Sequence, residues 1–363
     1  MREVAIAKNR VAMLKTFGGA ESIEVLTVDI PNPSRNQVLI QVESSSLVFT
    51  DLLIRRNMYP MLRKKPPFVL GYSFVGHVIA VGLGVTTVQP GERVADLTQT
   101  GSNADYVLRS SDTLVRVPKT LDAAEAETLV LSGMTAYQAL TRYRTMERGQ
   151  RVLITGAAGA VGHLAGQLCT EMGLTWYGTC SMPQRPAIES SGGTPIVYDS
   201  QEGTAQLELE SKTGFDLILD LSGADPPRTS RRRLREGGVL VLLGMRALWH
   251  RDAADRNTHL RDKLSILKHF FTGMLLKVRQ PRTVAIYSIA DRKSEKPGEF
   301  REDLSSLYRI LEAGKLKPKI AERIELEEIR RGHERLEREK LQGRLVIVHA
   351  KHNSQVHAPS QDH

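Results

Sequence analysis

The sequence predicts an α/β protein of two domains, in which a β-rich domain precedes a parallel, doubly wound sheet. Short strand-like runs fill the first third of the chain, and from about Ala123 helix-length segments alternate with apolar runs. The length of 363 residues also fits two domains, since one domain typically has about 100–200 residues. With 41% hydrophobic and 25% charged residues, the composition is that of a soluble globular protein and excludes disordered and collagen-like chains.

The β-rich domain is predicted from six strand-like runs between Ser22 and Val115, each bounded by Gly, Pro or Asn. The runs are EVLTV, QVLIQVES, GHVIAVG, ERVADL, DYVLRS and TLVRVP. Their close spacing favours a partly closed barrel. The N-terminal MREVAIAKNR has no apolar core of a signal peptide, and we interpret it as an extension of a cytoplasmic chain. Two cysteines, Cys169 and Cys180, exclude a disulfide framework and fit a reducing compartment.

The parallel sheet is predicted from five apolar runs separated by helix-length segments. They are RVLITG, LTWYGT, PIVYD, FDLILDL and GGVLVLLG. Further on, GEFREDLSSLYRILEAG and LEEIRRGHERLERE have the pattern of amphipathic helices, and GRLVIVH that of a closing strand. This last part fits neither pattern alone, which leaves open a return to the first domain. We predict that residues 351–363 form a disordered tail.

A glycine-rich turn between the strand RVLITG and the helix HLAGQLCTEMG is the strongest functional signal. Glycine lets the backbone approach a pyrophosphate, while the N–H groups at the start of the helix hold the anion. The strict GxGxxG pattern is not met, but the position between a strand and a helix favours dinucleotide binding over a tight turn without a ligand. The predicted contacts are Gly156, Ala157, Ala158, Gly159, Ala160, Val161 and Gly162.

The next strand predicts which dinucleotide binds. An NAD site would place Asp or Glu at its end to bind the ribose 2′-hydroxyl, and the segment YGTCSMPQR contains neither. Ser181 and Arg185 suit a 2′-phosphate instead, so NADPH is favoured over NADH. The alternative is that Ser181 only caps the following helix and that Arg185 is a solvated surface residue.

The ordered series of motifs resembles the medium-chain dehydrogenase/reductase superfamily, in its zinc-independent, zeta-crystallin-like quinone oxidoreductase branch. The series consists of FGGAESIEV, IPNP, LVFTDLLIRRNMYP, GYSFVGHVIAVG, PGERV, ADYV, SGMTAYQAL, VLITGAAGAVG and LEAGKLKPKIAERIELEEIRRGHERLEREKLQGRLVIV. The resemblance implies a GroES-like catalytic domain from residues 1–125 and 294–350, with a Rossmann NADP-binding domain, residues 126–293, inserted between them. It also implies a homodimer.

The resemblance further implies that no metal takes part. Zinc-dependent relatives carry a cysteine and a His-Glu pair where this chain has Val48 and Tyr72-Ser73, none of them a usual zinc ligand. Quinone reductases usually carry asparagine in place of Val48. Quinone is therefore a less certain acceptor, and a more apolar enone or enoyl substrate becomes credible.

Four residues complete the predicted site. Tyr59 matches the tyrosine that enoyl-thioester reductases of the superfamily use as an acid, and the alternative is a packed aromatic ring. Thr50 occupies the place of a proton-relay hydroxyl, although Thr50-Asp51 also suits a helix N-cap. Thr135 resembles the threonine that contacts the nicotinamide amide, unless it is only a helix residue. Tyr198, in the run PIVYD, is the last predicted cofactor contact.

Positive charge is concentrated in the second half of the inserted domain. Residues 228–235 contain five arginines, and residues 246–292 contain ten Lys and Arg against four Asp and Glu. This region could bind nucleic acid or anionic lipid, or it could be a solvated surface that attracts NADPH. Its apolar segment LSILKHFFTGMLLKV suits a membrane-surface helix, but we favour a helix that covers the sheet or lines the cleft.

The sequence therefore predicts an NADPH-dependent, zinc-independent enzyme that transfers a hydride to a small quinone or to an α,β-unsaturated carbonyl. Two alternatives stay open. One is an enoyl-thioester reductase of a biosynthetic pathway, and the other is an NADPH-binding adaptor at a membrane or on RNA with little turnover.

Overall fold

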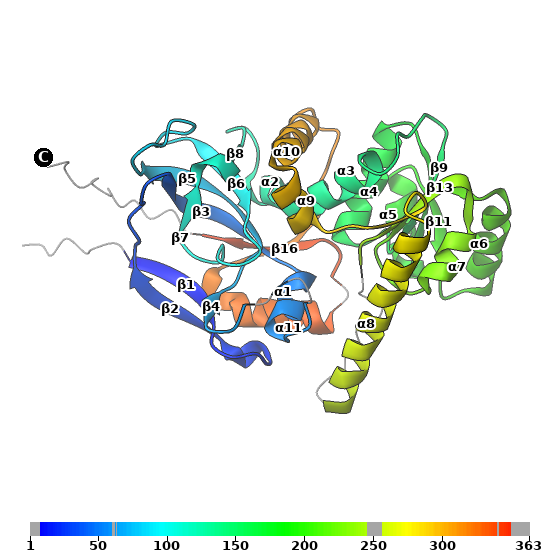
Figure 1. The fold of residues 1–363 in the computed structure, drawn as a ribbon, viewed down its shortest axis with the longest axis horizontal. Coiled ribbons are helices and arrows are strands. Elements are labelled where there is room, and N and C mark those ends of the chain that lie inside the picture. The colour runs from blue at the N-terminus through cyan, green and yellow to red at the C-terminus, as the bar shows by residue number, and fades with distance from the viewer. Residues whose placement is uncertain (1–7, 60–61, 63, 245–255, 340, 350–363) are drawn as a thin grey trace, which may run out of the picture. The chain divides into compact units, whose positions relative to one another are not determined.

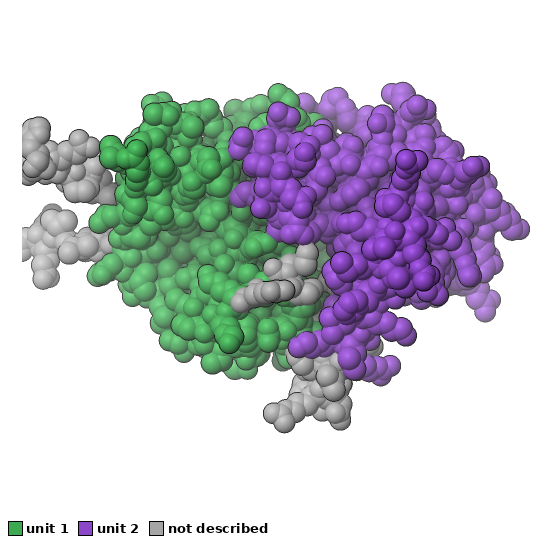
Figure 2. Space-filling model, in the orientation of Figure 1, with its two compact units in different colours: residues 1–131, 304–312, 320–363 green, residues 132–303, 313–319 purple. Residues whose placement is uncertain are grey.

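A computed structural model describes residues 8–59, 62, 64–244, 256–339 and 341–349. The chain forms two compact units (Figure 2). The first comprises residues 1–131, 304–312 and 320–363, and the second comprises residues 132–303 and 313–319. The tail predicted over residues 351–363 lies outside the described residues.

The first unit is built on two β-sheets (Figure 1). The larger has the order β15 (Ile320–Ile324), β16 (Arg344–Val348), β3 (Gln37–Leu47), β5 (Ser73–Val81), β6 (Arg93–Leu97) and β8 (Val115–Arg116), with β7 (Tyr106–Ser110) also paired to β3. The smaller has the order β2 (Ile23–Asp29), β1 (Lys8–Leu14) and β4 (Phe68–Val69). Because β16 pairs antiparallel with β3, the C-terminal part of the chain completes the sheet that the N-terminal part begins.

All six strand-like runs of the β-rich domain form strands, and apolar side chains of alternating positions fill its core. Val38, Ile40 and Val42 of β3 meet Phe74 and Val78 of β5 in this core. The interpretation of the N-terminal segment was partly wrong, because β1 begins at Lys8 and pairs with β2 along its whole length. The helices of this unit are α1 (Phe49–Arg55), α2 (Ala123–Thr128) and α11 (Ile329–Arg338).

The second unit contains a six-stranded sheet in which every pairing is parallel. Its order is β11 (Thr194–Val197), β10 (Thr175–Cys180), β9 (Arg151–Thr155), β12 (Phe215–Asp220), β13 (Leu234–Leu242) and β14 (Val284–Ile286). The order runs one way from β9 to β11 and the other way from β12 to β14. The topological switch point, where ligands bind in such sheets, therefore lies between β9 and β12. The predicted α/β fold class is confirmed.

Helices precede, connect and follow the strands of this unit (Figure 1). They are α3 (Met134–Thr141), α4 (Ala160–Glu171), α5 (Arg185–Ser190), α6 (Gln201–Thr213), α7 (Pro227–Arg232), α8 (Arg256–Arg279) and α9 (Ile289–Glu295), and α10 (Pro297–Glu312) follows. The apolar segment LSILKHFFTGMLLKV lies within α8, which covers part of the sheet beside β14. Across the described part of the chain, no helix combines the length and the apolar character needed to cross a membrane.

Candidate functional site

The predicted phosphate-binding turn lies at the switch point, between the end of β9 and the start of α4. Gly156 has a φ of 69°, a left-handed conformation that glycine adopts without strain. Gly162 lies in the first turn of α4, where a Cβ atom would be 2.6 Å from both the Cα of Ala157 and the carbonyl oxygen of Gly156. Glycine at position 162 thus allows the helix to pack directly against the turn.

Backbone hydrogen bonds fix the turn to the neighbouring strand. The Gly156 N–H donates to Oγ1 of Thr179 at 2.9 Å, and the Ala157 N–H donates to the carbonyl oxygen of Thr179 at 3.0 Å. Gly159 is the N-cap of α4 and has no side chain to cover the helix end. The first N–H groups of a helix have no partner within it, so the start of α4 can accept an anion. The geometry of Ala158, Ala160 and Val161 therefore fits the prediction of a pyrophosphate site.

The adjacent end of β12 holds polar side chains that the sequence analysis missed. Oγ1 of Thr155 donates to Oδ1 of Asp220 at 2.7 Å, and the Ser222 hydroxyl lies 3.0 Å from the Thr155 hydroxyl. Oδ2 of Asp220 and Nε2 of His269 are buried and have no hydrogen-bond partner among the described residues. Burial lowers the pKa of His269, and the negative charge of Asp220 opposes this shift. The available signal was Asp220 itself, an aspartate that ends a buried and mainly apolar strand.

Three predicted cofactor contacts follow the ends of β10 and β11, namely Ser181 and Arg185, predicted for the 2′-phosphate, and Tyr198. The Tyr198 N–H donates to the carbonyl oxygen of Cys180 at 3.1 Å, which brings Tyr198, with 54% of its surface exposed, beside Ser181. The Ser181 hydroxyl donates to Oε1 of Gln184 at 2.9 Å and caps a short 3₁₀ helix. Nε of Arg185 donates to Oε1 of Glu189 at 2.8 Å, in an exposed ion pair. Both predicted residues therefore have local partners that a phosphate would have to displace.

Thr135 lies near the start of α3, within a buried network of polar side chains. It hydrogen-bonds the Tyr287 phenol, whose pKa burial raises well above its usual value. The Tyr287 hydroxyl donates to Oε1 of Gln138 at 2.9 Å, and Nε2 of Gln138 donates to Oδ2 of Asp303 at 2.8 Å. Thr135 thus has a structural role in the second unit, while its predicted contact with the nicotinamide stays a prediction.

Tyr59 lies in the first unit and is paired with a second tyrosine. Its hydroxyl is 2.9 Å from the hydroxyl of Tyr72, and the two rings meet edge to face with centroids 6.4 Å apart. Tyr72 is 1% exposed, whereas Tyr59 is half-buried. Tyr72 and Ser73 are the positions where zinc relatives carry His and Glu. At position 72, a metal ligand in zinc relatives, this chain therefore has the Tyr72 phenol, which hydrogen-bonds the predicted acid Tyr59.

Thr50 lies in the first turn of α1, but the suggested Thr50-Asp51 N-cap is wrong. The N-cap is Val48, two residues before Thr50, and the helix begins at Phe49. Oδ2 of Asp51 accepts a hydrogen bond from the Val48 N–H at 2.8 Å, so Asp51 acts from within the first turn. Val48 itself is buried, as expected for an apolar side chain at this position.

Beneath Ser73 lies a cluster of buried charges formed by Asp51, Glu127 and Arg344. The Ser73 hydroxyl donates to Oε1 of Glu127 at 2.6 Å. Burial raises the pKa of Asp51 to about 7 and the pKa of Glu127 to about 7, despite the attraction of Arg344. Burial also lowers the pKa of Arg344. Across the described residues, no group of three or more His, Cys, Asp or Glu side chains is arranged to hold a metal ion.

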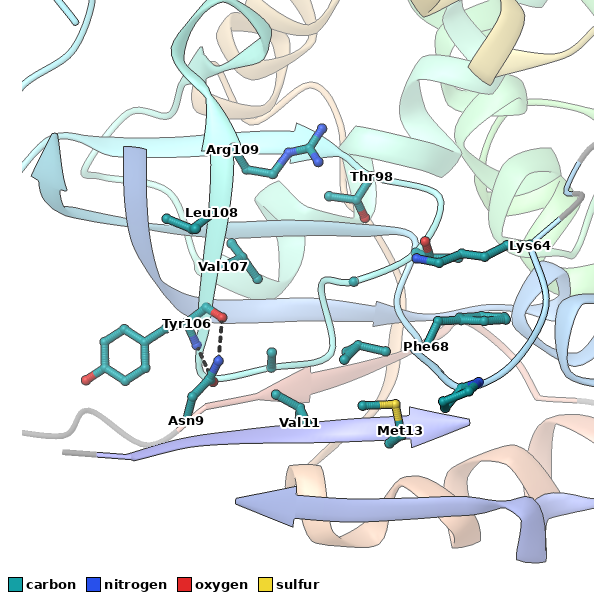
Figure 3. A pocket seen from close by; sticks show the side chains of 15 residues that line it. Asn9, Val11, Met13, Lys64, Phe68, Thr98, Tyr106, Val107, Leu108 and Arg109 are labelled. Carbon is teal, nitrogen blue, oxygen red and sulfur yellow. Dashed lines mark hydrogen bonds between the residues drawn. The ribbon is translucent and has the colours of Figure 1, made fainter. Parts of the chain in front are cut away.

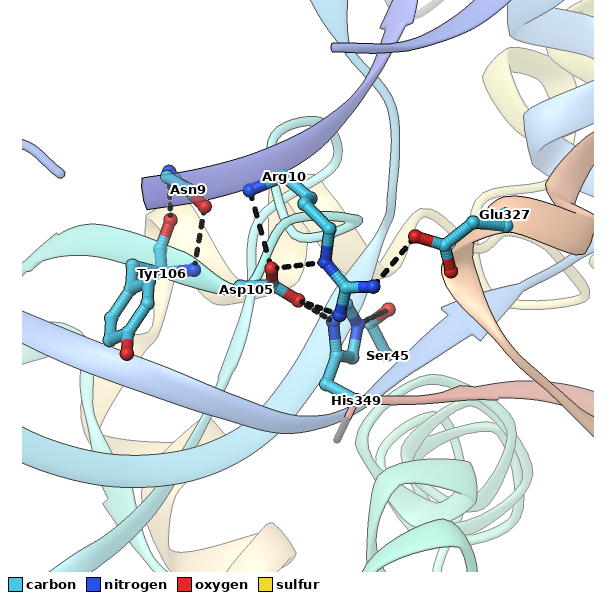
Figure 4. A network of polar contacts seen from close by, with 7 residues as sticks. All are labelled: Asn9, Arg10, Ser45, Asp105, Tyr106, Glu327 and His349. Atoms are coloured by element: carbon cyan, nitrogen blue, oxygen red, sulfur yellow. Dashed lines mark hydrogen bonds and ion pairs between the residues drawn. The ribbon is translucent and has the colours of Figure 1, made fainter. Parts of the chain in front are cut away.

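A second polar network joins the two chain ends within the first unit (Figure 4). Asp105 lies 3.0 Å from Nδ1 of His349 and accepts a hydrogen bond from Nε of Arg10 at 2.7 Å. Arg10 also donates to Glu327 at 2.6 Å, and Ser45 lies 3.1 Å from Nε2 of His349. Although burial opposes it, hydrogen bonds from His349 and Arg10 hold the pKa of Asp105 well below its usual value. This network ties β1, β3 and the end of β16 together.

A cavity of about 400 Å³ lies in the first unit (Figure 3). Its lining mixes apolar side chains such as Val11, Met13 and Phe68 with polar ones, among which Lys64 and Arg109 add positive charge. Nε of Arg109 is paired with the buried Asp96 at 2.6 Å. None of the predicted site residues lines this cavity, so it is separate from the predicted active site.

Two families match this chain. Residues 34–119 match the family described as alcohol dehydrogenase GroES-like domain, and residues 192–347 match the family described as zinc-binding dehydrogenase. The synaptic vesicle membrane protein VAT-1 homolog of Homo sapiens is 31% identical over 242 residues, which cover 65% of this chain and 61% of that protein. The chloroplast envelope quinone oxidoreductase homolog of Arabidopsis thaliana is 30% identical over 244 residues, which cover 64% of this chain and 74% of that protein.

Two further comparisons extend the range of relatives. A mycocerosic acid synthase-like polyketide synthase of Mycolicibacterium smegmatis is 29% identical over 255 residues, which cover 68% of this chain but 12% of that protein. The chain thus spans a small part of the polyketide synthase and about three fifths of the human relative. The solved Escherichia coli quinone oxidoreductase complexed with NADPH shares the fold, with a TM-score of 0.77 and 22% identity over 94% of this chain and 99% of that one.

Proposed function

Because this chain belongs to the quinone oxidoreductase branch of the medium-chain dehydrogenase/reductase superfamily, we propose that it is an NADPH-dependent reductase that works without zinc. The proposed acceptor is a small molecule with a carbon–carbon double bond conjugated to a carbonyl group. The observation that carries the proposal is the glycine turn at the switch point, where Gly162 leaves no room for a side chain.

The residues of the second unit fit a dinucleotide. The N–H groups at the start of α4 would hold the pyrophosphate, and Gly156 and Gly162 let the backbone reach it. When bound, NADPH supplies a hydride. Ser181, directly after β10, and Arg185, the first residue of α5, would bind the 2′-phosphate. The NADPH bound by the E. coli neighbour supports this choice of cofactor.

Tyr59 is the proposed proton donor of the first unit. Reduction of a conjugated double bond at its β-carbon leaves negative charge on the carbonyl oxygen, which needs a hydrogen-bond donor or a proton. The 2.9 Å contact with Tyr72 supports this role. When Tyr72 donates to Tyr59, its O–H dipole stabilises the phenolate that remains after Tyr59 has given up its proton.

An enoyl thioester is the second candidate substrate. The likeness to polyketide synthases favours it, since 68% of this chain aligns with one of them. The buried, apolar Val48, in place of the asparagine of quinone reductases, also favours an enoyl or enone acceptor over a quinone. We further propose a homodimer in a cytoplasmic setting, and the two free, buried cysteines Cys169 and Cys180 support a reducing environment.

The test is to follow NADPH oxidation with three acceptors, namely an enone, an enoyl-coenzyme A thioester and a quinone. Turnover with the enone or the thioester should exceed turnover with the quinone. Tyr59→Phe should lower turnover of the preferred acceptor by about 10–10³-fold, the range for losing one general acid or oxyanion donor. It should leave the NADPH dissociation constant unchanged.

Tyr72→Phe serves as the comparison, because it keeps the Tyr59 phenol and removes only its partner. Its turnover should lie between those of the unmodified protein and Tyr59→Phe. Tight NADPH binding without oxidation by any of the three acceptors would instead favour an NADPH-binding adaptor. Unchanged turnover of Tyr59→Phe would leave Tyr59 as a packing residue.

A further inference from the structure

Helix α8 has two apolar faces, and only one of them is used by the fold. On the inner face, Ile266 and Leu276 are buried, and Leu276 joins the core with Leu242 and Val284. A Cβ atom at Gly273 would lie 2.6 Å from Cδ1 of Leu242, so the helix rests closely on the sheet at this point. The inner face therefore accounts for the packing of α8 on the sheet. It does not account for the apolar residues of α8 that are exposed.

The outer face carries an exposed apolar stripe. It consists of Leu264, Leu267, Phe271, Met274, Leu275 and Val278, with exposed fractions of 58%, 36%, 63%, 49%, 43% and 73%. Apart from the adjacent pair Met274 and Leu275, the residues follow one another at steps of three or four, and all six lie within about 100° of the helix circumference. An apolar stripe of this length on the outer side of a packed helix marks an interaction surface.

Positive charges flank the stripe on both sides. At about 100° per residue, Arg261, Lys268 and Arg279 lie along one side, and Lys263 and Lys277 lie along the other. All five side chains are exposed, and none makes an ion pair with another described residue. The only acidic residue of the described part of α8, Asp262, is buried on the inner face.

We propose that the outer face of α8 docks on the surface of an anionic lipid bilayer. The apolar stripe would enter the boundary between headgroups and acyl chains, while the lysine and arginine side chains extend to the headgroups on each side. A second copy of the helix would meet the first with the same positive flanks, so charge favours an anionic surface over self-association. The helix lies on the membrane and does not cross it.

The test is flotation of the protein with vesicles of phosphatidylcholine alone and of phosphatidylcholine with 30% phosphatidylserine, at 0.1 M salt and without cofactor. Binding to the anionic vesicles should be at least tenfold stronger, since each lysine or arginine near such a surface contributes about fivefold. Phe271→Ser with Val278→Ser should lower that binding at least tenfold. Lys268→Gln with Lys277→Gln should lower it by a similar factor, and raising the salt should weaken binding further.

Leu209→Ser is the matched control, because Leu209 is 61% exposed on another helix, α6. This variant should bind the vesicles like the unmodified protein. Equal binding to both kinds of vesicle, or undiminished binding of both double variants, would overturn the proposal. So would a dimer by light scattering that Phe271→Ser with Val278→Ser dissociates without any loss of vesicle binding, since that result assigns the face to a second copy. None of these outcomes depends on the reductase activity.

Discussion

Replacing Arg185 with alanine should remove most of the preference for NADPH over NADH. Arg185 donates to Glu189 at 2.8 Å, and both side chains are about half exposed, so this i,i+4 pair contributes only about 0.3–0.5 kcal/mol. A hydrogen bond from a guanidinium to a phosphate contributes about 1.5–3 kcal/mol. The 2′-phosphate therefore gains about 1–2.5 kcal/mol by displacing Glu189, which predicts that NADPH binds about 5–70 times more tightly than NADH.

The assay is calorimetric titration of each cofactor into the unmodified protein and into Arg185→Ala. The alanine variant should bind the two cofactors with nearly equal dissociation constants, and its NADH affinity should not change. Glu189→Gln is the matched control, since it removes the competing carboxylate and should tighten NADPH binding by up to about twofold. Equal affinities in the unmodified protein would refute this reasoning. Parallel weakening of both cofactors in Arg185→Ala would mean that Arg185 only supports the local fold.

Three further predictions follow from the same structure. Gly162→Ala should weaken NADPH binding at least tenfold in the same titration, because its Cβ would lie 2.6 Å from two backbone atoms, and unchanged affinity would contradict the close packing. For the Glu127→Gln variant, the free energy of unfolding relative to that of the unmodified protein should rise by about 1–3 kcal/mol between pH 5 and pH 8, as measured by urea unfolding. The reason is that burial raises the folded pKa of Glu127 from 4.5 to about 7, so between these two values the unfolded state ionises while the folded state keeps its proton, and stability falls as pH rises through this range. An equal difference at both pH values would exclude this account. Elemental analysis should find well under one zinc per chain, and a stoichiometric amount would show that other ligands bind it.

The strands were predictable because each has a local pattern of its own. The apolar residues of β3 predicted a strand that the structure largely buries, and the mainly apolar runs of β9 and β12 are typical of buried parallel strands. Strand β1 was missed because its sequence begins with the polar residues Lys8, Asn9 and Arg10, which do not have the pattern of a strand. Its strand conformation depends on pairing with β2 and β4, which lie further along the chain. The glycine turn was found for the same reason as the strands, since strand, turn and helix are contiguous in the chain.

The side-chain partners of the site could not be predicted in this way. The contact of Tyr59 with Tyr72 and the contact of Ser73 with Glu127 join residues that are distant in sequence, and no local pattern records them. By contrast, the Arg185–Glu189 pair follows from the spacing of four residues on a helix and was overlooked. Asp220 acts on the pKa of His269 only because the fold brings the end of β12 near α8.

The contact between Ser73 and Glu127 bears on how this protein could change over evolutionary time. In zinc relatives, a His-Glu pair occupies positions 72 and 73, whereas here Glu127 places its own carboxylate against Ser73, fully buried. A glutamate at position 73 would place a second carboxylate beside the buried carboxylate of Glu127. Reversion would then require a change at Glu127 in addition to those at positions 48, 72 and 73. Glu127 thus makes the replacement of the metal ligands difficult to reverse one residue at a time, because a buried pair of carboxylates at positions 73 and 127 would cost stability.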